Sequence, residues 1–331
     1  MPLQPLSSIL VAGGAGYIGS HTAKFLQKQG IQPIVLDNLC TGNRWAAKFG
    51  VFYEGAISDA ALVERIIADH QPQGAILFAG HAYVGESTMN PRPYFRNNVS
   101  AAITFLNTLL DANLRSVVFS SSCSIYGIQE RVPIDEDCSK IPLSPYAETK
   151  LFLEKVLRWY GSAYGMKYAC LRYFNAAGAD PEGELGEFHD PETHLIPLVM
   201  QAALGGARLQ VFGTDYPTPD GTAIRDYVHV TDLAQVHLNA LRYLHDGGAS
   251  LELNVGTGRG HSVREVIQAV EHISGLPVPA DYGPRRVGDA PVLVADPTRA
   301  RAALGWAPKF SELDTIVRTA WNWQQSRTRL L

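Results

Sequence analysis

The chain has 331 residues, of which 46% are hydrophobic and 18% are charged, and its formal net charge is −4. This composition is typical of a folded globular protein and excludes extensive disorder. The small negative charge, without a run of like charges, gives no indication of a nucleic-acid or anionic-membrane partner, and no uncharged apolar stretch is long enough to span a bilayer.

The first predicted element is an apolar strand at 9–12 that ends in three regularly spaced glycines, followed by a helical pattern. The glycines are Gly13, Gly16 and Gly19. Without Cβ atoms the backbone can turn tightly and approach a pyrophosphate, and the helix start offers free N–H groups to that anion. A second strand, 33–36, ends in Asp37, where a carboxylate would accept ribose hydroxyls; an N-cap is the alternative role. A carboxylate there repels a 2′-phosphate, so the two motifs predict NAD rather than NADP.

The alternation of apolar runs and helical patterns continues along the chain. We expect strands at 51–53, 75–78, 117–119 and 168–171, and helices at 60–68, 99–110 and 151–159. Since the strands are nearly all apolar and alternate with helices, they predict an α/β fold with a doubly wound parallel sheet of the Rossmann type. Polar stretches follow three of these strands, at 80–90, 120–127 and 173–178. Their residues should therefore converge on one cleft beyond the carboxyl ends of the strands.

The pattern of alternating apolar strands and helices ends near residue 180. Long turn-rich loops at 181–184 and 213–221 separate shorter elements. We therefore expect an NAD-binding domain at 1–180 and a smaller, loop-rich α/β substrate domain at 181–331. The stretch 254–258 reads as a strand running into a glycine turn that suits either unit, so some segments are expected to cross back to the first domain.

Two stretches carry residues suited to catalysis. One is the serine-rich segment 120–127 at a strand end, and the other contains Tyr146 and Lys150 at a helix start. Four residues apart, Tyr146 and Lys150 share one helix face. An ammonium group and the positive nicotinamide ring favour the phenolate; lowering its pKa from near 10 by about three units requires about 4 kcal/mol. The pair suits a general base for alcohol oxidation, whereas such a pair standing alone is typical of a solvated helix face.

The cysteines and histidines give no sign of a metal site. The four cysteines, Cys40, Cys123, Cys138 and Cys170, lie far apart, and the ten histidines lack metal-ligand spacing. This pattern predicts reduced thiols in a cytoplasmic protein and no bound metal. The first residues also lack the features of a signal peptide.

Taken together, the motifs resemble those of the extended short-chain dehydrogenase/reductases and, within that group, of the UDP-glucose 4-epimerases, over about residues 8–325. The motifs are GGAGYIGSHT at 13–22, LDNL at 36–39, VGES at 84–87, NNV at 97–99, SPYxxxK at 144–150, LRYFN at 171–175, GTDYPTxDGT at 213–222, RDYVHV at 225–230 and RRxGD at 285–289. The resemblance implies NAD-dependent inversion at C4 of a UDP-hexose, from UDP-galactose to UDP-glucose, through a transient 4-keto sugar. It also implies a homodimer formed through helices near 98–110 and 151–164.

The resemblance assigns residues position by position. The catalytic positions are Ser122, which hydrogen-bonds the sugar 4-hydroxyl, Tyr146, the base and acid, and Lys150, which binds the nicotinamide ribose and polarises Tyr146. The cofactor positions are Gly13, Gly16, Tyr17, Ile18, Gly19, Asp37, Asn38, Ile57, Phe78, Ala79, Gly80, Asn97, Tyr146, Lys150 and Tyr173. The nucleotide-sugar positions are Ser122, Tyr146, Asn175, His194, Leu195, Arg225, Arg286, Asp289 and Leu293. The two guanidinium groups match diphosphate oxygens.

Three positions depart from the family pattern. Ala56 stands where an aspartate usually contacts adenine, so neighbouring Asp59 or backbone groups are expected to take that role. Ala82 stands where some members have lysine. Leu293 stands where glucose-restricted members commonly have tyrosine, so a broader sugar pocket, admitting UDP-N-acetylhexosamine or UDP-pentose, is one alternative.

Two other functions compete with epimerisation. A nucleotide-sugar 4,6-dehydratase or decarboxylase begins with the same oxidation, but a dehydratase needs an acid just after Ser122, where this chain has 123–125, Cys-Ser-Ile. A non-catalytic NAD-binding sensor would tend to lose Tyr146 or Lys150, and both are present.

Overall fold

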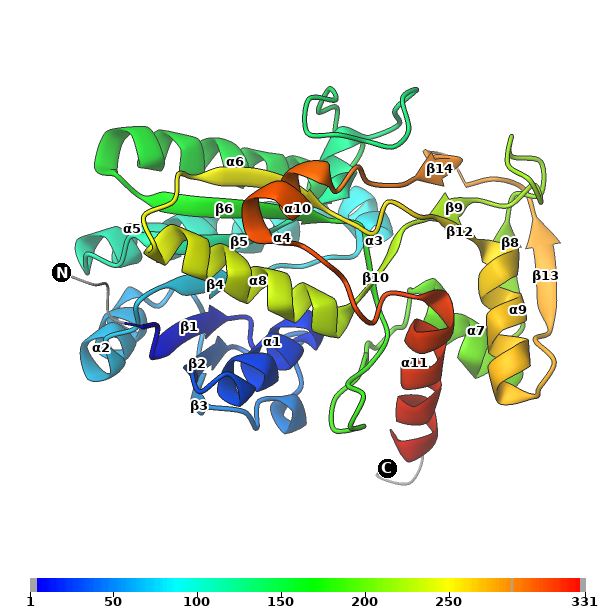
Figure 1. Ribbon diagram of the computed structural model, residues 1–331, viewed down its shortest axis with the longest axis horizontal. Coiled ribbons are helices and arrows are strands. Elements are labelled where there is room, and N and C mark those ends of the chain that lie inside the picture. Colours follow the sequence, from blue (N-terminus) through cyan, green and yellow to red (C-terminus); the bar gives the residue numbers. More distant parts are fainter. Residues whose placement is uncertain (1–4, 287, 328–331) are drawn as a thin grey trace.

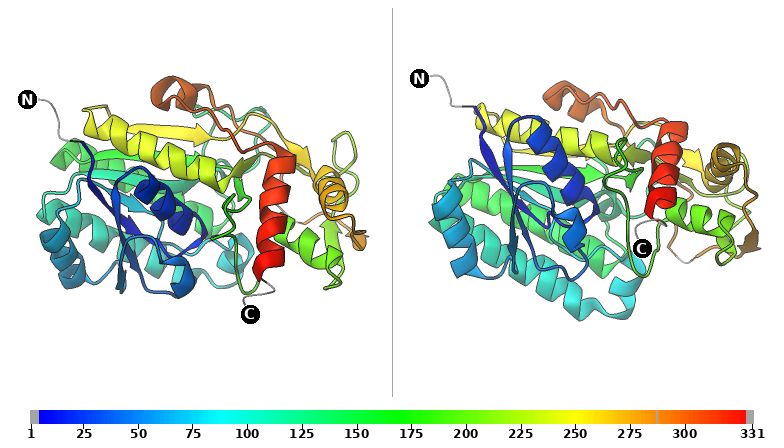
Figure 2. Two further views of the ribbon diagram at one scale, coloured as in Figure 1. Left: turned by 60° about the horizontal axis from the view of Figure 1, so that its bottom comes forward. Right: turned by 90° about the horizontal axis from the view of Figure 1, so that it is seen from below.

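The computed structural model describes residues 5–286 and 288–327. A seven-stranded parallel sheet lies at its centre, with helices on both faces (Figures 1 and 2). Its strands are β1 (Ser8–Ala12), β2 (Gln32–Asp37), β3 (Val51–Glu54), β4 (Ala75–Leu77), β5 (Ser116–Ser122), β6 (Lys167–Tyr173) and β11 (Leu251–Val255). Their order across the sheet is β11-β6-β5-β4-β1-β2-β3. The predicted doubly wound sheet is confirmed.

The strands are apolar because side chains on both faces are buried. Along β1, Leu10 and Ala12 pack into one hydrophobic layer, whereas Ile9 and Val11 pack into the other. The first layer contains α2 (Ala60–His70), α5 (Ala102–Asp111) and α6 (Pro145–Tyr164). The second contains α1 (Tyr17–Lys28), α8 (Val230–His245) and α10 (Thr298–Leu304). A strand covered on both faces needs no polar alternation.

Two elements near the cleft differ from the sequence prediction. β5 continues through Ser122, because its serines pair with β6 as far as Ser122↔Tyr173. The segment 120–122 is thus strand and not loop, and η3 (Cys123–Tyr126) follows it. The helix expected at 99–110 is the end of a longer helical run: α3 (Val84–Met89) is followed by α4 (Pro91–Tyr94), the π-helix η2 (Phe95–Ala101) and α5.

The wide turn of η2 has a local cause. It includes Asn98, which is only 2% exposed and turns toward the loop after β4. Its Oδ1 accepts from His81 N at 2.8 Å, and its Nδ2 donates to His81 O at 2.9 Å and to Thr149 Oγ1 at 3.2 Å. These polar contacts interrupt the apolar periodicity on which the predicted helix start depended.

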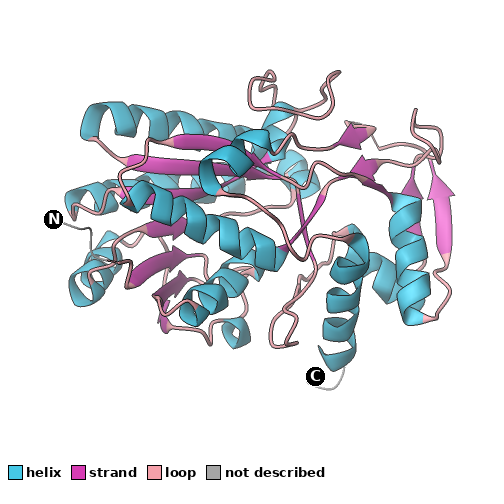
Figure 3. Cartoon of the chain, viewed as in Figure 1, coloured by secondary structure: helices cyan, strands magenta, loops and turns pink. Residues whose placement is uncertain are grey.

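A second hydrophobic core and three small sheets lie beyond the carboxyl ends of the large sheet (Figures 1 and 3). The sheets are β7 (Asn175–Ala177) with β10 (Tyr227–His229); β12 (His261–Ser262), β9 (Ile224–Arg225) and β14 (Val292–Leu293); and β8 (Leu209–Phe212) with β13 (Ala280–Gly283). The core is formed around α7 (Leu195–Ala203), α9 (Val263–Ser274) and α11 (Leu313–Arg327). The short helix η1 (Arg44–Ala46) completes the set of elements.

The chain crosses between the two regions more than once. The stretch near residue 254, which the sequence left open between the two units, includes the end of β11, the edge strand that pairs with β6. α8 and α10 also return to the large sheet. Among the helices of the described residues, none has the length and hydropathy needed to cross a bilayer.

Candidate active site

A cavity of about 560 Å³ opens at the carboxyl ends of the large sheet and is closed on its far side by the smaller sheets. Its walls include residues from β2, β5 and β6, from the loops that follow β1 and β4, and from α6, α7, β9 and β14. Every residue assigned by resemblance to catalysis, cofactor or nucleotide sugar lines this one cavity. Positions spread over 280 residues are thereby brought together, as the convergence of strand ends predicts.

The glycine turn after β1 is sterically obligatory. Gly13 has φ +82°, and a Cβ there would overlap the backbone of Ala79 after β4. A Cβ on Gly19 would overlap Gly13 O and Gly14 Cα. α1 then begins at Tyr17 with Gly16 as its N-cap and no side-chain cap, so its first N–H groups remain available to an anion. This is a cradle into which a pyrophosphate fits.

Asp37 joins the two predicted cofactor motifs physically. Its carboxylate accepts hydrogen bonds from Ala15 N at 2.9 Å, within the glycine turn, and from Leu39 N at 2.8 Å. Burial raises the pKa of Asp37, and these two backbone donors oppose that rise. The residue caps no helix but fixes the glycine turn while lining the cavity. Position and chemistry therefore fit an acceptor for ribose hydroxyls.

Tyr146 and Lys150 face the cavity from the first turns of α6. The helix is started by Ser144, whose Oγ accepts from Ala147 N at 3.2 Å, and by Pro145 at its first position. Lys150 Nζ donates to Ser120 O at 2.7 Å and lies 5.7 Å from the centre of the Tyr146 ring. Both side chains are buried, with the residues 8% and 5% exposed. The pair is therefore a fixed catalytic candidate and not a solvated helix face.

Burial dominates the protonation of this pair. It raises the pKa of Tyr146 well above its usual range, with Tyr173 adding to the rise and a hydrogen bond with Ser122 opposing it. Burial also lowers the pKa of Lys150 to about 8. The chain alone thus favours the neutral phenol, and deprotonation requires additional positive charge close to Tyr146.

Ser122 ends β5 with its hydroxyl turned into the cavity. Its Oγ accepts from Ser124 N at 3.2 Å and from the Ser124 hydroxyl at 2.9 Å. With the oxygen accepting twice, the proton of the Ser122 hydroxyl is left to donate toward Tyr146 or a bound ligand. Tyr173, at the end of β6, is hydrogen-bonded to the Ser120 hydroxyl.

The opposite wall carries the two arginines. Arg225 Nη1 donates to Ile224 O and Ala290 O, each at 2.9 Å, and the side chain is 15% exposed. Arg286 is 60% exposed and donates from Nε to Asp289 Oδ2 at 2.8 Å. Both side chains line the cavity, together with Asn175, His194, Leu195 and Leu293. A guanidinium has five N–H donors, so these hydrogen bonds do not use all of them.

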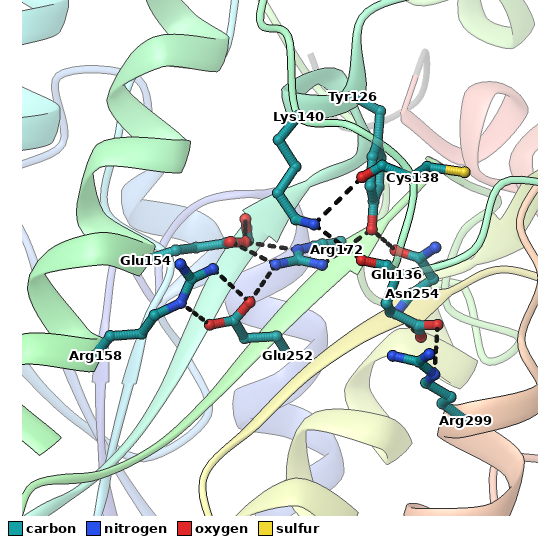
Figure 4. Close-up of polar contacts among 11 residues, drawn as sticks. Tyr126, Glu136, Cys138, Lys140, Glu154, Arg158, Arg172, Glu252, Asn254 and Arg299 are labelled. Carbon is teal, nitrogen blue, oxygen red and sulfur yellow. Dashed lines mark hydrogen bonds and ion pairs between the residues drawn. The ribbon is translucent and has the colours of Figure 1, made fainter. Parts of the chain in front are cut away.

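A buried ion network behind the site was not foreseen from the sequence (Figure 4). Arg172 on β6 makes a bidentate pair with Glu154 on α6, at 2.9 and 2.7 Å, and also pairs with Glu252 on β11. Ser121 Oγ donates to the same Glu154 carboxylate at 2.6 Å. Because Glu154 lies one turn beyond Lys150 and Ser121 precedes Ser122, the network ties together the helix and strand that carry the catalytic candidates.

The family departures have structural consequences. Asp59, the expected substitute at the adenine end, is instead the N-cap of α2, accepting from Leu62 N at 3.0 Å. It does not line the cavity, whereas Ala56, Ile57 and Ser58 do. Contacts to a base at this end therefore fall to backbone groups and Ser58. Ala82 also lines the cavity, without a charge at that position.

Comparisons with known proteins agree with this geometry. Residues 9–256 match the model of the NAD dependent epimerase/dehydratase family. A UDP-glucose 4-epimerase of Halalkalibacterium halodurans is 49% identical over 319 residues, 96% of each chain. The crystal structure of a UDP-glucose 4-epimerase from Brucella ovis in complex with NAD is 50% identical, with a TM-score of 0.94 over 95% of this chain and 97% of that one. The structure of a Bifidobacterium longum UDP-glucose 4-epimerase with NAD⁺ and UDP is 36% identical, with a TM-score of 0.92 over 98% of this chain and all of that one.

These matches run through both regions of the fold. The chain belongs to the NAD-dependent epimerase/dehydratase family.

Proposed function

We propose that this chain catalyses NAD-dependent epimerisation at C4 of a UDP-hexose, interconverting UDP-galactose and UDP-glucose through a transient 4-keto sugar. The observation that carries the proposal is the placement of Ser122, Tyr146 and Lys150 in one cavity between a glycine turn and a pair of arginines. Full-length relatives at 41–49% identity carry this activity in their names.

Proton movement falls to Tyr146. When bound, NAD⁺ supplies the acceptor, and then the donor, of the hydride at C4. Tyr146 Oη removes the proton of the sugar 4-hydroxyl and returns it after the sugar has turned over. The Ser122 hydroxyl donates a hydrogen bond that orients the sugar 4-oxygen. Lys150, held by Ser120 O, is a fixed positive charge beside the phenol when it is protonated.

Binding is divided between the two walls of the cavity. Arg225 and Arg286 hold the UDP diphosphate through charge-assisted hydrogen bonds, with Asp289 fixing the second guanidinium. The sugar end meets small side chains, among them Ser122 and Asn175. A firm grip on UDP and a loose grip on the sugar allow the 4-keto sugar to present its other face without escaping.

The dehydratase alternative lacks its acid. The residues after Ser122 are Cys123, Ser124 and Ile125, and burial raises the pKa of the Cys123 thiol to about 12. Such a thiol cannot exchange protons readily near neutral pH. Elimination of water from C5 and C6 is therefore not supported.

The test is to incubate the purified protein with UDP-galactose and no added cofactor. We expect UDP-glucose to accumulate without consumption of NADH, and Tyr146→Phe to reduce kcat by orders of magnitude while UDP affinity stays within about threefold. Accumulation of a 4-keto-6-deoxy sugar, or near wild-type turnover by Tyr146→Phe, contradicts the proposal. Tyr160→Phe is the matched control, because Tyr160 lies on the same helix outside the cavity.

Leu293 supports a broader sugar pocket as a second candidate. It lies on β14 beside Arg225 of β9 and lines the cavity. Leucine is smaller than tyrosine and lacks its hydroxyl, so an N-acetyl group at C2 is admitted more easily. Because such discrimination is worth about 1–3 kcal/mol, Leu293→Tyr should raise the kcat/KM ratio of UDP-glucose over UDP-N-acetylglucosamine by about 10-fold or more. An unchanged ratio would mean that leucine only fills an apolar wall.

A homodimer in the cytoplasm fits the remaining surface features. Phe152, Trp159 and Tyr164 on α6 are 47%, 73% and 57% exposed, an apolar surface suited to a symmetric helix–helix contact. The four cysteines are unpaired, as in reducing compartments. Size-exclusion chromatography with light scattering of Trp159→Glu against wild type tests the dimer.

A further inference from the structure

The loop between β7 and α7 carries two glutamates and two histidines whose ligand atoms converge. They are Glu187, His189, Glu192 and His194. Each offers one carboxylate oxygen or imidazole nitrogen, and the four atoms lie within 4.8 Å of one another. The mechanism above uses none of them to move a proton, and His194 alone is assigned by resemblance to the nucleotide-sugar wall of the cavity.

The cluster combines two buried carboxylates with two partly exposed histidines, whose side chains are 17% (His189) and 46% (His194) exposed. The side chains of Glu187 and Glu192 are each only 7% exposed. Glu187 is hydrogen-bonded to His194 Nδ1, and Glu192 Oε1 accepts from the backbone N–H groups of residues 193 and 194 at 2.8 and 2.9 Å. His189 Nδ1 is buried and lies 3.3 and 3.6 Å from the two carboxylates, yet it makes no hydrogen bond. His189 Nδ1 is thus a buried polar atom close to two carboxylates that lacks a hydrogen-bond partner.

A neighbouring acidic cluster shows what is different here. Asp180, Glu182 and Glu184 also converge, but Lys24 Nζ lies among them, 2.6 and 2.8 Å from the first two and in contact with the third. That cluster contains its own cation. Among the described residues, no lysine or arginine pairs with Glu187 or Glu192.

We propose that Glu187, His189, Glu192 and His194 form a binding site for a divalent transition-metal ion of the zinc type. Imidazole nitrogens with carboxylate oxygens suit zinc, whereas magnesium and calcium prefer oxygen ligands alone. Tetrahedral zinc bonds of about 2.0–2.2 Å place ligand atoms about 3.4 Å apart, so side-chain shifts of about 1 Å close the present cluster around an ion.

A cation on this loop would compensate two buried carboxylates that have no lysine or arginine partner among the described residues. The sequence spacing predicted no metal because the four ligands are separated by one or two residues only, on an irregular loop that no helix or hairpin signature describes.

The site would fasten one wall of the active-site cavity. Glu187, His189 and His194 line the cavity, and His194 is the N-cap of α7. The His189 ring meets those of Tyr17 and Tyr83 edge-on, with centroid distances of 6.4 and 5.9 Å. Because Tyr17 starts α1 at the glycine turn, an ion on this loop would connect the two walls through His189.

The test is direct metal binding, independent of catalysis. The full-length protein in a Cys40→Ser background, which removes the exposed thiol, is treated with chelator, dialysed and titrated with Zn²⁺ by calorimetry. Co²⁺ then replaces Zn²⁺ to report coordination through its visible absorption, and Mg²⁺ is the specificity control. We expect one saturable Zn²⁺ equivalent, tetrahedral Co²⁺ bands and no comparable Mg²⁺ binding.

Variants distinguish this site from surface binding. His189→Ala and Glu192→Gln should each weaken Zn²⁺ binding by more than the 10–100-fold typical of losing an outer-shell partner, about 100-fold or more. His272→Ala, an exposed histidine on α9, should bind as the parent does. Circular dichroism establishes that each variant is folded, and Glu192→Gln retains the shape of the native side chain. Absence of a saturable equivalent, or equal affinity in Glu192→Gln and His272→Ala, overturns the proposal.

Discussion

The buried pair formed by Arg172 and Glu154 gives the sharpest test of what supports the catalytic cavity. Their side chains are 1% and 0% exposed and share two hydrogen bonds, while the Arg172 guanidinium also donates to the Tyr126 hydroxyl at 3.0 Å. We expect Arg172→Leu to lower the free energy of unfolding by about 3–5 kcal/mol, because it leaves the Glu154 carboxylate buried with Ser121 as its remaining donor. Glu154→Leu should cost a similar amount, because it removes the bidentate partner of the guanidinium and leaves only the shared, partly exposed Glu252 as its counterion.

The double variant separates the cost of a stranded charge from the net contribution of the pair. Replacing both charges by leucine removes the uncompensated ion. It leaves the Ser121 hydroxyl without its partner and takes one of two partners from the Tyr126 hydroxyl, which still donates to Asn254 Oδ1 at 2.7 Å, at about 1 kcal/mol for each lost hydrogen bond. The double variant should therefore lose about 1–3 kcal/mol, less than either single variant. Urea unfolding followed by circular dichroism measures all four proteins.

An exposed ion pair is the control. Arg208 and Asp281 are 57% and 49% exposed, so Arg208→Ala should change the unfolding free energy by less than about 1 kcal/mol. A double variant that loses the sum of the two single effects, about 6–10 kcal/mol, would refute the reasoning. It would mean that the network stabilises the fold through each charge separately and not as a compensated pair.

Three further substitutions, at Gly13, Arg225 and Arg286, test the walls of the cavity, with two control variants. Gly13→Ala places a Cβ against the Ala79 backbone at positive φ, so we expect NAD retention to be at least 10-fold weaker, as measured by the absorbance of the purified protein. The control is Gly85→Ala, whose Cβ would meet nothing within 4 Å and which should retain NAD normally. Arg225→Ala should weaken UDP binding in calorimetry by about 1.5–3 kcal/mol, or one to two decades, and the more exposed Arg286→Ala by less. Arg285→Ala, which does not line the cavity, should leave UDP affinity unchanged, and an equal loss there would mean that the arginines act only through overall charge.

Local patterns predicted the sheet because each strand satisfies its own requirement. The apolar run 9–12 of β1 is buried on both faces, and a glycine turn can be recognised because its geometry excludes a Cβ. The convergence of Ser122 and Tyr146 also follows from topology, since Ser122 lies at the carboxyl end of β5 and Tyr146 lies on α6, which packs against the sheet. These features need no information from distant residues.

Features that depend on partners distant in the chain could not be predicted from the sequence. Arg172 follows a predicted apolar strand and has the composition of a surface residue, yet it is fully buried because β5, β6 and β11 bring it to Glu154 and Glu252. Asp59 or backbone groups were expected to contact adenine, and of these Asp59 is the N-cap of α2. Neither the competition for hydrogen bonds at a helix start nor an ion pair between residues 80 positions apart can be recognised in the sequence pattern alone.

The protonation of Tyr146 depends both on its burial in the fold and on a nearby positive charge. Burial that protects the site from water raises the pKa of the phenol and lowers that of Lys150 to about 8, and both shifts favour a neutral pair. Lys150 Nζ lies 5.7 Å from the Tyr146 ring centre and donates to Ser120 O, so its position beside the phenol is fixed. Its desolvation, however, disfavours the charged form of the amine. A cationic nicotinamide beside the pair favours the phenolate over the phenol by Coulomb attraction in the same low-dielectric site, where such an interaction is strong. The base should therefore become competent in response to the oxidised cofactor, which couples proton removal from the sugar to the presence of a hydride acceptor and keeps the phenol neutral otherwise.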